Sequence, residues 1–293
     1  MSAFVRFWGT RGSIPTPGHG TRRYGGNTSC VELRIDDTLF ICDGGTGLRE
    51  LGLALVQRAA HGVEAHMFFS HMHWDHIQGF PFFVPAYAPK NHLHVYEVDR
   101  SDTRVQRLLH GQMRSEYFPV TFADLGATIS AGFFESGTIQ VDGVTVRCME
   151  QTHPGRSFAY SFEKNGTKVV YATDSELDSL IQNRDESEQD RDALRRLPSE
   201  LVAFCAGADL LIADAQYTDS EYPAKVGWGH ARANTVVDLA VQANVRQCAL
   251  FHHDPMQSDD AVDIKVNEGR ERATRASSPV TVFGAREGLE LKL

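Results

Sequence analysis

His71-Met72-His73-Trp74-Asp75-His76 is the stretch of sequence that decides the predicted fold, because it crowds four potential metal ligands into six residues. His71 and His73 are two positions apart just beyond a predicted strand, and in extended backbone such side chains point the same way. Both imidazoles can therefore reach one metal ion, while Asp75 and His76 can face a second ion as the chain turns. Packing gives no reason to crowd so many costly polar groups together, so the stretch indicates a metal site.

Three further candidate ligands, His153, Asp174 and His252, each follow a predicted strand. A carboxylate between two histidine-rich groups suits a bridging role, because each of its two oxygens can bind one cation. Imidazole and carboxylate without thiolate favour Zn²⁺, with Mn²⁺, Fe or Ni²⁺ as alternatives. A lone histidine after a strand is more often a hydrogen-bonded structural residue, so His153 and His252 are candidates only because the first loop is present.

Composition and charge limit the class of protein. The 293-residue chain has 42% hydrophobic and 23% charged residues, which is typical of a globular protein with a sizeable core. Its formal net charge of −9 weighs against a general nucleic-acid binder. The five cysteines are scattered and contain no Cys-x-x-Cys pair, so neither a disulfide framework nor a thiolate zinc site is expected. With no secretory signal pattern and no membrane-spanning run, we expect a cytoplasmic protein without a membrane partner.

The hydrophobic pattern predicts layered sheets flanked by helices in one domain over residues 1–293. Asn165-Gly166 is a signal for a hairpin turn. β-Branched and aromatic runs predict strands at residues 4–8, 30–35, 39–42, 63–70, 93–98, 143–150, 158–163, 168–172, 210–213, 247–251 and 280–283. Apolar periodicity predicts helices around residues 48–56, 233–242 and 260–275. The charged segment 175–199 is expected to form a helix and loop excursion at the surface.

The metal loop resembles the signature loop of the metallo-β-lactamase superfamily, and other motifs extend the resemblance over nearly the whole chain. Phe7-Trp8-Gly9-Thr10-Arg11-Gly12-Ser13-Ile14-Pro15-Thr16-Pro17, Asn27-Thr28-Ser29-Cys30 and Asp43-Gly44-Gly45-Thr46-Gly47 resemble the tRNA 3′-processing endonuclease (ribonuclease Z) group and its phosphodiesterase relatives. Gly229-His230-Ala231 and Leu250-Phe251-His252-His253-Asp254-Pro255 are similar to the closing segment of that group. The resemblance implies an α/β fold, a four-layer αβ/βα sandwich of two mixed β-sheets flanked by helices.

The same resemblance implies roles for individual residues. One metal ion would be held by His71, His73 and His153, the other by Asp75, His76 and His252, with Asp174 as the bridge. Asp75 would also orient the metal-bridging hydroxide that attacks the substrate.

His230 and Asp214 match a pair that faces the scissile phosphate, and a histidine charged by a carboxylate is a suitable general acid. Asp214 could instead cap a helix after its strand. His253 would support the ligands from behind or contact the substrate.

These roles predict a phosphodiesterase that depends on two divalent metal ions. Two departures favour a small or cyclic nucleotide over tRNA. The tRNA-processing enzymes often carry a long arm between the positions of His153 and Asp174, but only 20 residues intervene here. Ala231 also replaces the serine that commonly follows the helix-opening histidine. The alternatives are a tRNA 3′-processing endonuclease and a hydrolase of lactams, lactones or thioesters.

Two further groups of side chains could contact a substrate. Aromatic residues beside the metal loop could stack on a base, although such residues more often pack in a core; they are Trp74, Phe80, Phe82, Phe83 and Tyr87. Arginines near the amino terminus could form a substrate lip or lie solvated in loops; they are Arg6, Arg11, Arg22 and Arg23. The resemblance also suggests a homodimer.

Overall fold

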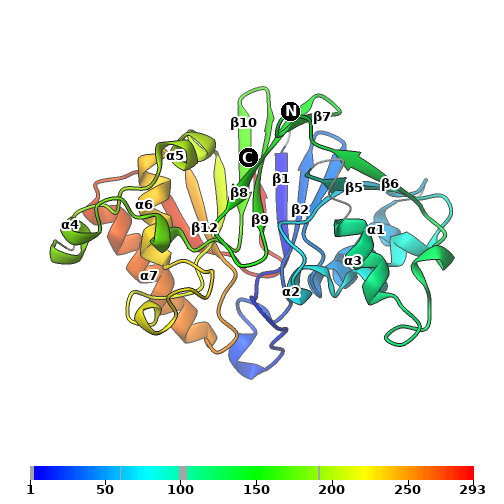
Figure 1. Cartoon of the computed structure of the whole chain (residues 1–293), viewed down its shortest axis with the longest axis horizontal. Coiled ribbons are helices and arrows are strands. Elements are labelled where there is room, and N and C mark those ends of the chain that lie inside the picture. Colours follow the sequence, from blue (N-terminus) through cyan, green and yellow to red (C-terminus); the bar gives the residue numbers. More distant parts are fainter. Residues whose placement is uncertain (1–2, 60, 99–103, 191) are drawn as a thin grey trace.

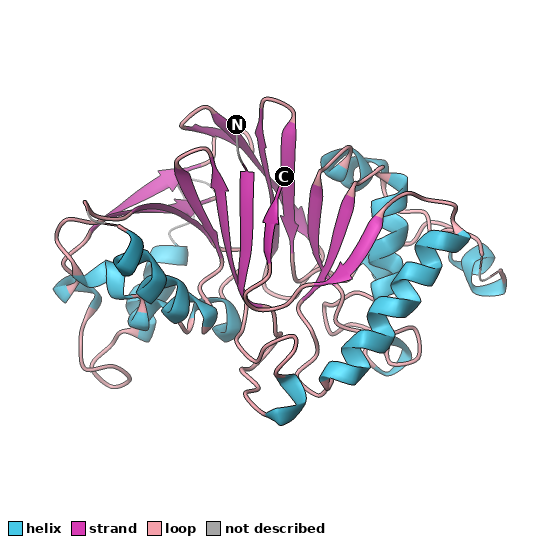
Figure 2. Cartoon of the chain, turned by 180° about the vertical axis from the view of Figure 1, so that it is seen from behind, coloured by secondary structure: helices cyan, strands magenta, loops and turns pink. Residues whose placement is uncertain are grey.

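Two seven-stranded mixed sheets pack face to face, and helices cover the outer face of each (Figures 1 and 2). This computed structural model describes residues 3–59, 61–98, 104–190 and 192–293. The four layers confirm the αβ/βα sandwich predicted from the sequence. None of the helices among these residues has the length and apolar character needed to cross a membrane.

The first sheet has the strand order β14-β1-β2-β3-β4-β5-β6. Its strands are β1 (Ala3–Gly9), β2 (Cys30–Ile35), β3 (Thr38–Cys42), β4 (Glu64–Phe68), β5 (His92–Glu97), β6 (Thr128–Phe133) and β14 (Glu290–Lys292). Pairing is antiparallel from β14 to β3 and parallel from β3 to β6. The predicted strands of this half are present, whereas the sequence pattern missed β6 and β14.

The second sheet has the order β13-β12-β11-β10-β9-β8-β7. Its strands are β7 (Thr138–Val141), β8 (Val144–Gln151), β9 (Ser157–Lys164), β10 (Thr167–Ala172), β11 (Leu210–Asp214), β12 (Gln247–Phe251) and β13 (Thr281–Gly284). Strands β7 to β10 are antiparallel, and β10 to β13 are parallel. The predicted hairpin joins β9 to β10, and Asn165 and Gly166 both have the positive φ, 48° and 86°, that this turn requires.

Alternating side chains explain why both faces of each sheet are buried. In β4, Ala65 and Met67 pack under the helices, whereas Phe68 faces the opposite sheet. The rings of Phe40 and Phe68 meet Phe162 of the second sheet at centroid distances of 5.1 and 5.3 Å. These aromatic contacts fill the layer between the sheets and fix the strand ends relative to one another.

The helices of the first half are α1 (Gly47–Arg58), α2 (Trp74–Ile77) and α3 (Arg104–Gln112), and those of the second half are α4 (Arg184–Gln189), α5 (Ser199–Cys205), α6 (Ala233–Gln242) and α7 (Asp259–Arg275). The start of α7 shows how the sequence sets a boundary. Ser258 accepts a hydrogen bond from the Ala261 amide, and Asp259 and Asp260 lie in the first turn, where the helix dipole favours negative charge.

The chemistry-bearing side chains lie at one edge of the sandwich because parallel strands end at the same edge of a sheet. The chain leaves β4 for His71, β10 for Asp174 and β12 for His252. The turn between β8 and β9 adds His153 at the same edge, since β9 runs antiparallel to β10.

Candidate metal centre

Three histidine nitrogens form the first ligand group. The Nδ1 atom of His73 lies 2.8 Å from Nε2 of His71 and 3.2 Å from Nε2 of His153. Burial lowers the pKa of His71 well below its usual value, and nearby His76 lowers it further. Burial and His153 likewise lower the pKa of His73. Both imidazoles are therefore neutral near pH 7, which is the form that binds a metal ion.

Asp75, His76 and His252 form the second group, and all three are buried. The Oδ2 atom of Asp75 lies 3.2 Å from Nε2 of His76 and 3.1 Å from Nε2 of His252. Within the described part of the chain, the buried Nε2 atom of His76 has no hydrogen-bond partner. A buried polar atom of this kind requires a partner, and a metal ion in the group would supply one.

Asp174 lies between the two groups and turns one oxygen to each. Its Oδ1 atom is 3.3 Å from Nε2 of His76 and 3.2 Å from Nε2 of His252. Its Oδ2 atom is 3.5 Å from Nε2 of His71 and 3.8 Å from Nε2 of His153. The structure thus brings all seven predicted ligands together, and the donor chemistry fits divalent metal ions.

Asp43 supports the second group and was missed in the sequence analysis. Its Oδ2 atom accepts hydrogen bonds from Tyr171 at 2.6 Å and Ser70 at 2.8 Å, and lies 2.7 Å from Nδ1 of His76. A carboxylate in this position fixes the ring and leaves Nε2 for the metal. The sequence feature that could have indicated this role is the position of Asp43 directly after β3, at the start of the glycine-rich turn. In the structure its φ is +61°.

The amino-terminal motif also contacts the second ligand group. The Ser13 amide donates a 2.7 Å hydrogen bond to Oδ2 of Asp75. Gly12 lies against the ring of His252, so that a Cβ atom there would come within 2.6 Å of it. Arg11 is fully buried and donates to the carbonyl oxygens of Asp254 and Gln257, so it anchors this loop and forms no substrate lip.

His230 and Asp214 form a hydrogen-bonded pair beside the metal ligands. Nδ1 of His230 lies 2.7 Å from Oδ2 of Asp214 and 3.9 Å from Oδ2 of Asp174. Burial opposes protonation of His230, but the charge and hydrogen bond of Asp214 outweigh it and raise the pKa to about 9. Asp214 also accepts from the Gln216 amide at 3.0 Å, which caps a turn after β11; no helix begins there.

Two buried carboxylates behind the metal ligands hold the loop that carries His230. Glu176 accepts from the amides of Gly227 at 2.7 Å and Gly229 at 3.0 Å. Asp178 accepts from the Arg232 amide at 2.8 Å. Residues 175–178 are buried, so the expected surface excursion begins only after them. Neither role is apparent from the sequence, because both acids lie in a segment that is charged and low in apolar residues.

His253 lies in the interior of the protein and not where a residue that contacts substrate would lie. It is fully buried, and its Nε2 atom lies 2.8 Å from the carbonyl oxygen of Ala285. Its ring packs edge-on against Tyr24 at 5.2 Å. The φ of His252 is +57°, so the chain turns after β12, and the two neighbouring side chains point to different surroundings.

The ligands open to solvent through a cavity of about 270 Å³, which is lined by Ser13, His73, Trp74, Asp75, Asp174 and His230. Trp74 is 66% exposed at its rim. Phe80 and Phe83, by contrast, are fully buried in the core under the first sheet's helices. Of the aromatic residues near the loop, Trp74 is thus placed to meet a substrate, whereas these two are core residues.

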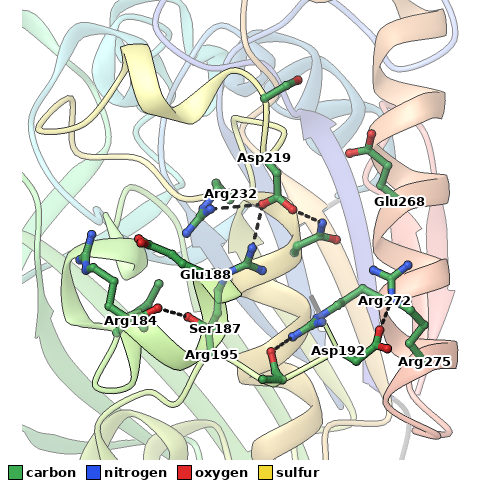
Figure 3. Close-up of a pocket in the computed structure, with 14 residues that line it drawn as sticks. Arg184, Ser187, Glu188, Asp192, Arg195, Asp219, Arg232, Glu268, Arg272 and Arg275 are labelled. Atoms are coloured by element: carbon green, nitrogen blue, oxygen red, sulfur yellow. Dashed lines mark hydrogen bonds and ion pairs between the residues drawn. The ribbon is translucent and has the colours of Figure 1, made fainter. Parts of the chain in front are cut away.

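A larger cavity of about 670 Å³ lies beside α4, α6 and α7, and no metal ligand lines it (Figure 3). Several of its charged side chains pair with one another. Asp219 meets Arg195 at 3.1 Å and Arg232 at 3.5 Å, and Arg275 meets Asp192 at 3.4 Å. Because no metal ligand lines this cavity and several of its arginines are paired with carboxylates, we assign the chemistry to the smaller cavity.

Comparison with known proteins agrees with this geometry. The family model described as "Beta-lactamase superfamily domain" matches residues 38–253. Curated relatives include ribonuclease Z of Natronomonas pharaonis, 24% identical over 86% of this chain and 87% of the relative, and ribonuclease Z of Staphylococcus carnosus, 22% identical over 85% and 87%.

Solved structures with the same fold include YhfI of Bacillus subtilis, described as a metallo-beta-lactamase fold protein, with a TM-score of 0.69 and 17% identity over 100% of this chain and 99% of that one. A diphosphatase from the PhnP family has a TM-score of 0.64 and 16% identity over 99% and 98%. The short form of human tRNase Z has a TM-score of 0.64 and 16% identity over 98% of each chain.

Proposed function

The chain belongs to the Beta-lactamase superfamily domain family and is a metal-dependent hydrolase, and we propose that it is a phosphodiesterase. The enzyme would use two divalent metal ions, preferably Zn²⁺, and act on a small or cyclic nucleotide. The observation that carries the proposal is the placement of Asp174. It turns one oxygen to each ligand group, and the His230–Asp214 pair lies beside it.

Each side chain then has a defined part in the reaction. Metal ions bound in the two groups would supply an activated water and neutralise charge on the phosphate. Asp75, held by the Ser13 amide, would orient that water. Because Asp214 occupies Nδ1 of His230, the Nε2 atom is left to donate a proton to the leaving oxygen.

The substrate class follows from the size and surroundings of the cavity. A cavity of about 270 Å³ suits a small ligand, and the exposed ring of Trp74 at its rim can stack on a base. Between His153 and Asp174 the chain forms only the β9–β10 hairpin, which offers no arm for tRNA. The net charge of −9 also opposes binding of a large polyanion.

A tRNA 3′-processing endonuclease is the second candidate, and the names of the curated relatives favour it. The two candidates share the same chemistry and differ in how much of the substrate the protein contacts. Hydrolysis of a lactam, lactone or thioester is a third candidate, but it gives no use to a general acid at His230.

The first experiment is hydrolysis of bis(p-nitrophenyl) phosphate by purified protein, with Zn²⁺ or Mn²⁺ and with a chelator. We expect turnover that depends on the metal. Cyclic nucleotides, short dinucleotides and a precursor tRNA are then compared by kcat/KM, and the small substrates should be preferred. Metal-loaded protein that cleaves no phosphodiester would contradict the proposal and direct attention to lactams, lactones and thioesters.

A further inference from the structure

A second cluster of metal-binding side chains lies at the opposite end of β4. Glu64 begins this strand, and His66 pairs in register with His94 of β5. These side chains face the layer between the sheets, and one ligand atom from each of the three lies within 4.8 Å of the others. His66 lies five positions before His71 along mostly extended chain, roughly 15 Å away, so this cluster is distinct from the metal centre.

The two imidazoles are held as metal-binding histidines usually are. Their rings stack at a centroid distance of 4.6 Å and an interplanar angle of 12°. Nδ1 of His66 lies 2.9 Å from the hydroxyl of Tyr96, and Nδ1 of His94 lies 2.9 Å from the hydroxyl of Ser130. When each Nδ1–H donates to its hydroxyl, both Nε2 lone pairs are left for a metal ion.

The Nε2 atom of His66 is available to a ligand. The residue is 7% exposed, and within the described part of the chain no protein group makes a hydrogen bond to this atom, which is left open to solvent or an ion. The closest acidic oxygen, Oδ2 of Asp142, is 3.9 Å away, too far for a hydrogen bond.

Two carboxylates complete the surroundings. Glu64 Oε1 lies 3.1 Å from Nε2 of His94. Asp142 lies in the turn between β7 and β8 of the second sheet, where Thr38 donates a 3.0 Å hydrogen bond to its Oδ2 atom. Both carboxylates are more than 60% exposed, so a small rotation can bring either one to a shared ion.

We propose that Glu64, His66 and His94, with Asp142 as the fourth ligand, form an additional Zn²⁺ site, here called the outer site. Two imidazoles and two carboxylates supply the four ligands that tetrahedral Zn²⁺ takes in a structural site. The ion would join β4 and β5 of the first sheet to the β7–β8 turn of the second. Its function is to hold the two sheets together at the end remote from the substrate.

The test measures Zn²⁺ bound per chain by elemental analysis after equilibrium dialysis. Wild type is compared with Glu64→Gln/His94→Gln, which alters only partly exposed side chains and leaves the buried His66 in place. His92→Gln is the matched control, because His92 is an exposed histidine on the same strand and the same face as His94. We expect the double variant to bind one equivalent less than wild type, and His92→Gln to equal wild type.

A second measurement locates the ion. Anomalous diffraction at the zinc edge should place a peak about 2 Å from Nε2 of both His66 and His94 in wild type and none in the double variant. Equal zinc content in wild type and double variant, an equal loss in His92→Gln, or no peak at this position would each overturn the proposal. Phosphodiesterase activity of metal-loaded protein should be the same in all variants, so the outer site and the proposed function can fail separately.

Discussion

The Nδ1 atom of His230 lies 2.7 Å from Oδ2 of Asp214, and the same histidine is 3.9 Å from the carboxylate of Asp174. One side chain thus links the buried carboxylate of Asp214 to the carboxylate that lies between the two ligand groups. This arrangement separates two tasks. On the proposed assignment, the seven ligands bind metal without His230, so His230 can be altered without removing a ligand.

His230→Ala should therefore reduce cleavage of phosphodiesters while metal content stays intact. The loss of a general acid typically costs about 10²–10⁴-fold in rate. The effect should be largest for a dinucleotide, whose alcohol needs a proton to leave, and smaller for bis(p-nitrophenyl) phosphate, whose phenolate leaves unaided. The measurement is kcat for both substrates together with elemental analysis of bound metal.

Asp214→Asn should reproduce most of this loss, since an amide no longer stabilises the charged imidazole. His92→Ala, a substitution of an exposed histidine, serves as the control and should leave kcat unchanged. If His230→Ala cleaves the dinucleotide at the wild-type rate, the proposed general acid is wrong.

Glu176→Gln should disturb the placement of His230 without touching the metal ligands. The carboxylate accepts from two backbone amides, those of Gly227 and Gly229, and from the hydroxyl of Tyr222 at 2.8 Å. An amide nitrogen in place of one oxygen would face a donor, costing about 1–3 kcal/mol of stability. We expect kcat to fall about tenfold or more, with KM and metal content little changed.

Glu188→Gln, a change on the exposed side of α4, is the control for this variant. A fall in stability with unchanged kcat would mean that Glu176 supports the fold alone and does not position His230.

The sequence pointed to candidate ligands that lie together in the structure, because these residues follow strands. His71, Asp174 and His252 each come directly after a buried apolar run, and such runs are recognisable without tertiary information. Parallel strands bring those positions to one edge of each sheet, so candidate ligands far apart in the chain lie close together in the structure. The strand and helix boundaries around them were accurate for the same reason.

The elements and roles that the sequence analysis missed depend on tertiary contacts. Strand β6 has no buried residue among its six, and β14 has only three residues, so neither carries a strong apolar pattern. Asp43 and Glu176 act through hydrogen bonds to segments distant in sequence, which no local pattern reveals. His253 does not line the substrate cavity, because adjacency to a ligand in sequence is not adjacency in space.

Gly12→Ala should weaken metal binding at the second ligand group. A methyl group there would come within 2.6 Å of the ring of His252, which has no room to move because it is fully buried. Titration with Zn²⁺ and a competing chelator should show weaker binding of one ion. Gly18→Ala is the matched control in the same loop, where a Cβ atom would meet nothing within 4 Å. Equal affinities in the two variants would contradict the assignment of His252 as a ligand.

Lys265 should make folding stability depend on pH. It is fully buried, and its Nζ atom donates to the Gln216 carbonyl at 3.1 Å and to Oε1 of Gln257 at 2.8 Å. Burial lowers its pKa from 10.5 to about 7, although Glu221 and Asp214 oppose the change. Between these two values the unfolded chain holds the proton more tightly than the folded chain, so stability increases as pH rises through this window.

Lys265→Met removes the amine and with it the pH-dependent part of the stability that Lys265 contributes. The other titrating groups remain in both proteins. Subtracting the unfolding free energy of the variant from that of wild type should leave a difference that rises between pH 7 and 9. The slope of this difference should approach about 1.4 kcal/mol per pH unit, because wild type gains stability relative to the variant as pH rises. Chemical denaturation at several pH values gives the curves, with Lys292→Met, an exposed lysine in β14, as the control. Parallel curves for wild type and Lys265→Met would mean that the buried amine stays charged, sustained by its two acceptors and the surrounding carboxylates.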